Sequence, residues 1–183
     1  PVVNFITRSV HNLLKVKFDK QDGFADHSVT VLDPAAGTLT FPAQAIQLAV
    51  EEFKNKYGDG GIKSLISDHI LKNFYAFELM MAPYAVGHMK IGFVLDELGY
   101  KLTDQERFNL YLTNALDFNQ ENPDIIPGIL EKTIAEESEQ ALDIKEKIQV
   151  IAIIGNPPYS VSSSNTIRED TEFFELYDSY KEK

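Results

Sequence analysis

Short apolar runs alternate with longer segments of helical periodicity along the chain, and this alternation constrains the fold more than any other feature. Runs rich in β-branched and aromatic residues predict strands over residues 29–32, 73–77, 107–112 and 149–154. Apolar residues at helical spacing predict helices over residues 1–18, 41–57, 62–72, 82–98 and 129–141. Because strands that alternate with helices usually form parallel sheets, we expect an α/β fold with one helix ahead of the first strand.

Local signals refine this outline. The fourth run, QVIAII, is almost wholly apolar, which predicts a central place in the sheet. Thr40 is expected to cap the helix at 41–57 through its hydroxyl group. Residues 19–28 are expected to form a polar loop, and residues 113–128 an irregular one.

The composition excludes several kinds of site. Hydrophobic residues make up 44% of the 183 residues, enough for one core. No apolar run approaches the roughly 18 residues that span a membrane, and no signal peptide is visible, so we expect a soluble, cytoplasmic protein. The chain has no cysteine, which excludes disulfides, thiolate zinc sites and a cysteine nucleophile. No metal site is expected, because the histidines lack ligand spacing and are predicted at the surface or at caps: His11, His27, His69 and His88.

The net charge argues against an extended nucleic-acid-binding surface. The chain has 17 Lys and Arg and 28 Asp and Glu, a formal charge of −11. Duplex binding normally recruits many cationic side chains to the phosphates. If the substrate is a nucleic acid, we expect most phosphate contacts to come from regions other than these residues.

The segment VLDPAAGTLTFPAQA, residues 31–45, is typical of a ligand-binding turn. An apolar strand ends at Asp33, and the small residues Ala35, Ala36 and Gly37 let a ligand approach the backbone. The helix that follows offers free N–H groups at its start. The segment is neither the dinucleotide pattern G-x-G-x-x-G nor a P-loop. The alternative is that the small residues serve helix–strand packing only.

A carboxylate follows the second predicted strand. Glu78 ends the stretch YAFE, and an acid at this point of a doubly wound sheet can accept hydrogen bonds from ribose hydroxyls. The alternative is a surface glutamate that caps the next helix.

The tetrapeptide Asn156-Pro157-Pro158-Tyr159 directly follows the fourth predicted strand and Gly155. Two consecutive prolines make this segment rigid, and Pro157 holds Asn156 extended. The Asn156 side chain offers a carbonyl and Tyr159 a flat ring, which suit an exocyclic amine on a base turned out of a duplex. The alternative is a rigid turn that only shapes a loop.

These segments together resemble the gamma class of amino-methyltransferases that act on DNA. The similarity rests on PVVNFITRSVHNLLK at residues 1–15, DPAAGT, Glu78, FYAFELMMAPYAVGHMKIGF and NPPY, in that order. It extends to the methylase part of large restriction–modification polypeptides, including the type ISP group. The resemblance implies a Rossmann-like sheet of class I S-adenosylmethionine-dependent methyltransferases, present in part, with strand order 3-2-1-4 and the fourth strand at an unpaired edge.

The resemblance also implies roles for single residues. Glu78 would accept the ribose hydroxyls, and Asn114, where members often carry Asp, would contact the adenine end of the cofactor. The other residues expected to line the S-adenosylmethionine site are Asp33, Pro34, Ala35, Ala36, Gly37 and Thr38. Those expected to hold a flipped adenine are Asn156, Pro157, Pro158 and Tyr159. Two departures stand out: Leu39 replaces a common glycine and is expected to close the helix start more tightly, and no Thr-Pro pair precedes residue 1.

We therefore expect one partial methyltransferase domain over residues 1–183. Residues 1–28 would form the N-terminal helix and loop, 29–159 the cofactor and NPPY core, and 160–183 a loop and acidic tail, with target recognition and DNA contacts in other regions. The expected reaction is transfer of a methyl group from S-adenosylmethionine to N6 of adenine in DNA, which needs no enzyme thiolate. These residues alone are expected to be inactive on DNA, and the exposed sheet edge favours self-association.

Two alternatives stay open at this point. A methyltransferase acting on adenine in RNA or on a protein glutamine would use the same tetrapeptide. A non-catalytic structural module of a restriction complex would bind the cofactor weakly or not at all.

Overall fold

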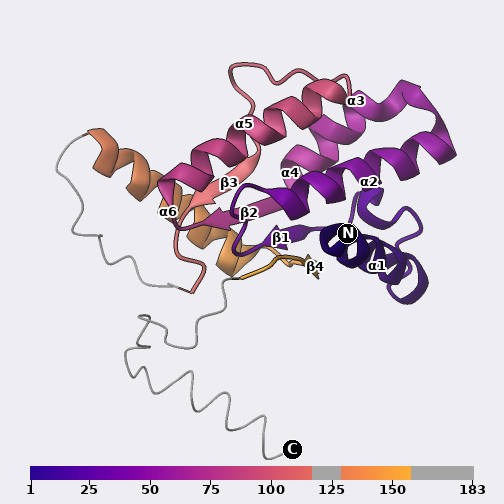
Figure 1. Cartoon of the computed structure of the whole chain (residues 1–183), viewed down its shortest axis with the longest axis horizontal. Coiled ribbons are helices and arrows are strands. Elements are labelled where there is room, and N and C mark those ends of the chain that lie inside the picture. Colours follow the sequence, from indigo (N-terminus) through magenta and orange to yellow (C-terminus); the bar gives the residue numbers. More distant parts are fainter. Residues whose placement is uncertain (117–128, 158–183) are drawn as a thin grey trace, which may run out of the picture.

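The computed structural model of the chain describes residues 1–116 and 129–157 (Figure 1). These residues form one four-stranded sheet in the order β3-β2-β1-β4, and every neighbouring pair is parallel. The strands are β1 (Val31–Asp33), β2 (Phe74–Glu78), β3 (Asn109–Leu112) and β4 (Ala152–Ile153). The expected α/β class and strand order are confirmed, and the arrangement is compatible with a Rossmann-like fold.

Helices lie against both faces of this sheet (Figure 1). The long helices are α1 (Val2–Lys17), α2 (Thr40–Tyr57), α5 (Met81–Glu97) and α6 (Ile129–Lys147). A short helical stretch precedes β2 and consists of α3 (Ile62–Leu65), the π-helical turn η3 (Ile66–Ile70) and α4 (Leu71–Asn73), and the 3-10 turn η2 (Asp59–Gly61) precedes it. In the described part of the chain, no helix is both long enough and apolar enough to cross a membrane.

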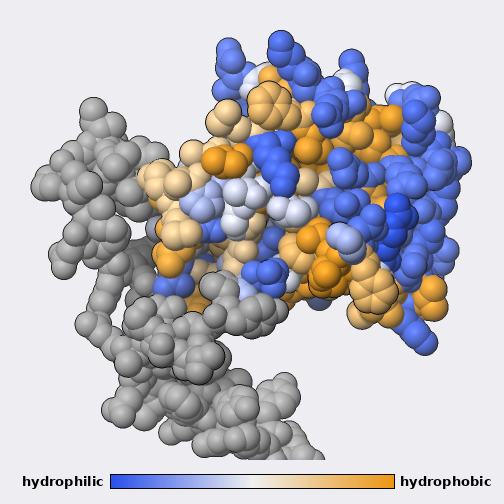
Figure 2. Space-filling view, viewed as in Figure 1, coloured by the Kyte–Doolittle hydropathy of each residue, from blue (hydrophilic) through white to orange (hydrophobic). Residues whose placement is uncertain are grey.

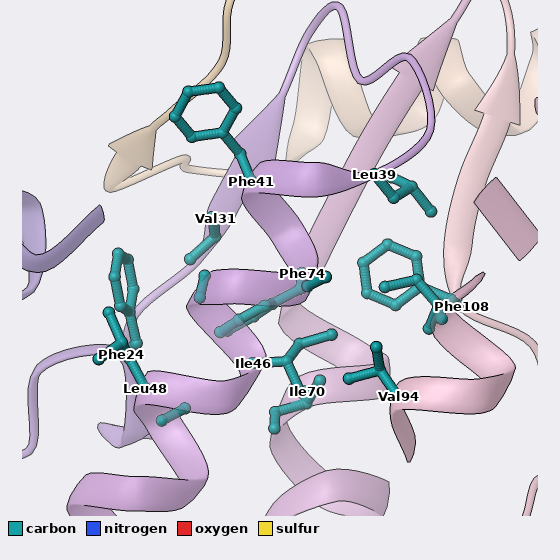
Figure 3. Close-up of a cluster of buried hydrophobic side chains, with 14 of the residues drawn as sticks. Phe24, Val31, Leu39, Phe41, Ile46, Leu48, Ile70, Phe74, Val94 and Phe108 are labelled. Atoms are coloured by element: carbon teal, nitrogen blue, oxygen red, sulfur yellow. The ribbon is translucent and has the colours of Figure 1, made fainter. Parts of the chain in front are cut away.

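The side chains of β2 alternate between two hydrophobic clusters, one on each face of the sheet. Phe74 and Ala76 belong to the large core cluster with α2, η3 and α5, part of which is drawn in Figure 3. Tyr75 and Phe77 point to the other face and join a smaller cluster that includes Ala141 of α6. Because successive residues of a strand face opposite sides, β2 is buried on both faces, as a central strand of a parallel sheet requires.

The fourth strand differs from its prediction. Only Ala152 and Ile153 pair with β1, they lie at the edge of the sheet, and the Ile153 side chain is 66% exposed. Thr30 interrupts the ladder, because its carbonyl accepts hydrogen bonds from both Ile151 N–H (3.2 Å) and Ala152 N–H (2.9 Å). Two successive donors on one acceptor leave the chain irregular before Ala152. The predicted strand over residues 149–154 is therefore confirmed only at Ala152 and Ile153, and its predicted central place is wrong.

The predicted polar loop at 19–28 contains a buried turn, η1 (Gly23–Ala25). Phe24 is fully buried there, and two histidines satisfy its backbone. Phe24 N–H donates to His11 Nδ1 (3.2 Å), and His69 Nε2 donates to Phe24 O (2.8 Å). Both rings are buried, so the expectation of surface or capping histidines is wrong for these two.

Two predicted helix ends also change. α6 continues to Lys147, six residues beyond the predicted end at 141. α2 begins at Thr40, with Leu39 at the N-cap position and no side-chain cap. The Thr40 hydroxyl instead accepts a hydrogen bond from Lys90 Nζ (3.0 Å), so it does not cap the helix as expected.

Candidate functional site

The turn between β1 and α2, residues 34–39 and here called the β1–α2 turn, lies at the carboxyl edge of the sheet. Its backbone is tied to β2, because Ala36 N–H donates to Phe77 O (2.9 Å). Gly37 has a positive φ of 54°, a conformation that glycine adopts without strain. Ligands of open α/β sheets bind at this edge, outside the carboxyl ends of the strands.

Asp33 is a buried carboxylate with half of its hydrogen-bonding capacity unused. Its side chain is 1% exposed, and Oδ1 accepts the Ala35 N–H (3.1 Å). Oδ2 is buried and has no hydrogen-bond partner among the residues that the structure describes. Burial is the main cause that raises the pKa of Asp33 to about 7; the Ala35 hydrogen bond opposes it, and the charge of Glu78 adds to it. A buried acceptor of this kind suits a cationic or hydrogen-bonding ligand group.

The Glu78 side chain at the end of β2 accepts hydrogen bonds from the β1–α2 turn and from the start of α5. Its Oε2 accepts the Gly37 N–H (2.7 Å) and its Oε1 accepts the Met80 N–H (2.8 Å). The residue is 8% exposed, so it is not the surface glutamate of the alternative interpretation, although Met80 does stand at the N-cap position of α5. Each carboxylate oxygen has a second lone pair, which leaves Glu78 able to accept hydroxyl donors.

Gly155 brings the start of the proline-rich tetrapeptide to Asp33. Ile154 N–H donates to Leu32 O (3.0 Å), so the chain runs beside β1 to its end. A Cβ added at Gly155 would lie 2.6 Å from Asp33 Oδ1 and 3.5 Å from Pro34 Cδ. Only glycine allows this approach. The structure thus brings two segments together that are more than a hundred residues apart in the sequence.

Asn156 and Pro157 follow this contact and are exposed, while Pro158 and Tyr159 lie outside the described residues. Thr38 is also exposed, and Pro34, Ala35 and Gly37 are half-buried. The predicted residues 33–38, 78 and 156–157 therefore gather at one edge of the sheet.

Asn114 follows β3, the strand beside Glu78. Thr113 N–H donates to Glu78 O (2.9 Å), which places Asn114 one residue beyond a backbone bond to the site. The Asn114 side chain accepts the Leu116 N–H (3.0 Å), and its backbone carbonyl accepts a hydrogen bond from Lys145 Nζ (2.8 Å). Its side chain thus stabilises its own turn.

Exposed apolar side chains accompany Glu78 and Asn114, a feature that the sequence analysis missed. Leu79 is 63% exposed and Met80 61%, directly after Glu78, and Leu116 is 75% exposed after Asn114. Figure 2 shows that apolar residues also gather on the surface beside α5. Because these loops leave neighbouring parallel strands at the same edge, the site combines carboxylates with apolar surface.

Leu39 ends the β1–α2 turn in the left-handed region, with φ 59° and ψ 40°. This conformation costs a non-glycine residue roughly 1–2 kcal/mol. The side chain is fully buried, which offsets the cost through packing. Glycine would adopt this backbone conformation without strain, and here a buried leucine occupies the position.

The described part of the site holds no cluster for a metal ion. Residues 1–116 and 129–157 contain no group of three His, Asp or Glu side chains placed to bind one. The carboxylates Asp33 and Glu78 instead face backbone N–H groups.

Solved structures with a similar region come from restriction–modification proteins. A nuclease-deletion mutant of the type ISP restriction–modification enzyme LlaGI, in complex with a DNA substrate mimic, matches 97% of this chain with 28% identity and a TM-score of 0.69. The ATP-dependent type ISP restriction–modification enzyme LlaBIII, bound to DNA, matches 96% with 26% identity and a TM-score of 0.71. A DrdV–DNA complex matches 90% with 26% identity and a TM-score of 0.62.

The matched region is a small part of those proteins. The chain spans 14%, 12% and 14% of the LlaGI, LlaBIII and DrdV chains, respectively. No family model matches the sequence, and no curated protein matches it either. The similarity supports a restriction–modification context for the segment.

Proposed function

We propose that these residues form the S-adenosylmethionine-binding part of a methyltransferase that modifies N6 of adenine in DNA, within a restriction–modification protein. The observation that carries the proposal is the meeting of Asp33, Glu78 and Gly155 at the carboxyl edge of a parallel sheet. The type ISP similarity of the whole described segment supports the same context.

The residues present fit the proposed cofactor. Glu78 retains lone pairs for ribose hydroxyls. Asp33 Oδ2 is a buried acceptor for a cationic amine. Leu79 and Leu116 provide exposed apolar surface for a purine ring. When bound, S-adenosylmethionine supplies an electrophilic methyl group on a sulfonium.

The acceptor would be held by the tetrapeptide after Gly155. Pro157 restricts Asn156 to an extended backbone, and the Asn156 side-chain carbonyl is the group that would accept an N–H of an exocyclic amine. Holding the amine in this way directs its nitrogen lone pair toward the methyl group. Such orientation accounts for much of the barrier reduction in two-substrate reactions. Pro158 and Tyr159 keep their proposed roles in holding the base.

DNA is the acceptor that the similar structures favour. LlaGI, LlaBIII and DrdV were each solved with DNA or a DNA substrate mimic. The net charge of −11 does not suit phosphate binding, so the cationic contacts would come from other regions of the polypeptide.

Cofactor binding is tested by calorimetric titration of S-adenosylmethionine into the chain, with Asp33→Ala as the variant that removes the buried acceptor. We expect binding by the natural sequence and none by the variant. No binding by either, at millimolar ligand, would refute the cofactor assignment.

The acceptor is tested in the complete polypeptide, because we expect DNA contacts outside these residues. Methyl-labelled S-adenosylmethionine is supplied with duplex DNA, RNA or a glutamine-containing peptide, and labelled products are identified by mass spectrometry. Label in N6-methyladenine of DNA, lost in Asn156→Ala, would support the proposal. Label in RNA or glutamine would indicate the alternative substrates, and binding without any transfer would indicate a structural module.

A further inference from the structure

Leu39 closes the β1–α2 turn with a buried side chain on a backbone that glycine favours. Its φ of 59° lies in the left-handed region, yet the side chain is fully buried. Such a conformation persists where the surrounding structure holds it. The packing of the Leu39 side chain, rather than the preference of its backbone, therefore decides the path of the turn.

Gly87 of α5 provides the space for this side chain. A Cβ added at Gly87 would lie 3.1 Å from both Leu39 Cγ and Leu39 Cδ1, and 3.1 Å from Leu110 Cδ2. These distances are shorter than ordinary carbon contacts. Figure 3 shows Leu39 at the start of α2, with its side chain turned toward the part of the core where Phe108 and Val94 lie.

The contact ties two segments of the site together. Leu39 ends the β1–α2 turn, and Gly87 lies on α5, the helix that follows Glu78 along the chain. Glu78 already holds the middle of the turn through Gly37 N–H. Leu39 lies at its far end, where its N–H donates to Ala36 O (2.8 Å) and its side chain packs against Gly87.

We propose that Leu39 is a positioning residue of the cofactor site, whose contact with Gly87 keeps the β1–α2 turn in the conformation that places its backbone beside Asp33 and Glu78. The inference rests on the proposed function, because the ligand of the turn is the proposed cofactor. It has an unexpected consequence. Glycine at position 39 would relieve the backbone but release the turn, so it should weaken cofactor binding.

The test compares Leu39→Gly with Leu65→Ala. Leu65 is 1% exposed on α3, outside the β1–α2 turn, so its replacement also removes buried leucine contacts from the core. S-adenosylmethionine affinity is measured by calorimetry at a temperature where every variant is folded, and exchange of the Gly37 amide proton is followed by NMR. We expect Leu39→Gly to lower affinity and to speed exchange by about tenfold or more, and Leu65→Ala to change both by less than about twofold.

Changes on both sides of the contact complete the design. Leu39→Met keeps the volume and should retain affinity, whereas Gly87→Ala should weaken binding by displacing Leu39. The double variant Leu39→Ala/Gly87→Ala should bind S-adenosylmethionine more tightly than the sum of the two single-variant losses predicts. The reason is that the methyl group added at position 87 would occupy space that the shortened side chain at position 39 leaves empty. Fully additive effects would contradict the inference.

The outcomes separate the two proposals. If the natural sequence binds S-adenosylmethionine and Leu39→Gly behaves like Leu65→Ala, Leu39 is an ordinary core residue and the proposed function stands. If the natural sequence does not bind, the proposed function fails. In that case the exchange rate of the Gly37 amide still decides whether Leu39 holds the turn.

Discussion

Gly37 donates its backbone N–H to Glu78 Oε2 over 2.7 Å, and this bond joins the turn after β1 to the end of β2. The same carboxylate accepts the Met80 N–H through its other oxygen. Glu78 therefore shapes the two loops of the candidate site before any ligand binds. This double role predicts that stability and ligand binding depend on the same side chain.

Replacing Glu78 with glutamine should affect both properties. One acceptor oxygen becomes an NH₂ group that faces a backbone N–H, so a buried donor loses its partner. We expect a loss of about 1–3 kcal/mol in the free energy of unfolding, measured with urea, and weaker S-adenosylmethionine binding by calorimetry. The control is Glu51→Gln, since the Glu51 side chain is 54% exposed in a surface ion pair with Arg8 and should change stability by less than about 1 kcal/mol. Equal effects of the two substitutions would contradict the assignment.

Binding of a cationic ligand should depend on the protonation of Asp33. Burial raises the pKa of this carboxyl to about 7, so it is largely neutral at pH 5.5 and largely ionised at pH 7.5. We expect S-adenosylmethionine affinity to rise through this range by up to about tenfold per pH unit below the pKa. Calorimetry at several pH values checks this. Asp33→Asn should bind weakly with little pH dependence, and a flat profile for the natural sequence would exclude the role of Asp33.

The Asp33 carboxylate should also destabilise the fold at neutral and alkaline pH. Its pKa is 3.8 in the unfolded reference and about 7 in the folded protein, so the folded state binds more protons between these values. Stability from this group therefore falls as the pH rises from about 4 to about 7. Asp33→Asn should be more stable than the natural sequence at pH 8, by on the order of 2–4 kcal/mol, and similar to it near pH 4. Urea unfolding at both pH values gives the comparison, and parallel pH profiles would refute the prediction.

Gly155→Ala should disrupt the approach of the two segments. The new Cβ would lie 2.6 Å from Asp33 Oδ1, so β4 and the residues after it must move. We expect a loss of about 1–3 kcal/mol in stability and much weaker cofactor binding. The matched control is Gly92→Ala on α5, where, apart from its chain neighbours and the helix's own backbone, no described atom lies within 4 Å of the added group. That change should stabilise the helix by up to about 1 kcal/mol. If Gly155→Ala is as stable as the natural sequence or more stable, the close contact does not exist in solution.

Much of the framework could be predicted from local patterns. α1 and α5 begin and end within a residue or two of their predicted bounds, because apolar residues at helical spacing and Gly99 mark them clearly. The strand order β3-β2-β1-β4 also agrees with the order implied by the family resemblance. The ends of β1 and β2 were close enough to place Asp33 and Glu78 at the carboxyl edge.

Contacts between residues far apart in the sequence decided the features that the local patterns did not predict. Thr30 shortens β4 by taking two hydrogen bonds from residues about 120 positions away, a relationship that no local pattern contains. His11 and His69 bury the turn around Phe24 from two different helical segments, although its sequence is mostly polar.

The sequence by itself determined which chemical groups reach the carboxyl edge of the sheet, because strand length and alternation set where Asp33, Glu78 and Asn156 fall along the chain. Only the tertiary structure decided how those groups are used. It left Asp33 Oδ2 buried without a partner among the described residues and gave both oxygens of Glu78 to backbone donors. It also placed Leu39 over Gly87. The physical reason is that burial and hydrogen bonding depend on atoms brought from distant positions, whereas periodicity reports only the environment of neighbouring residues.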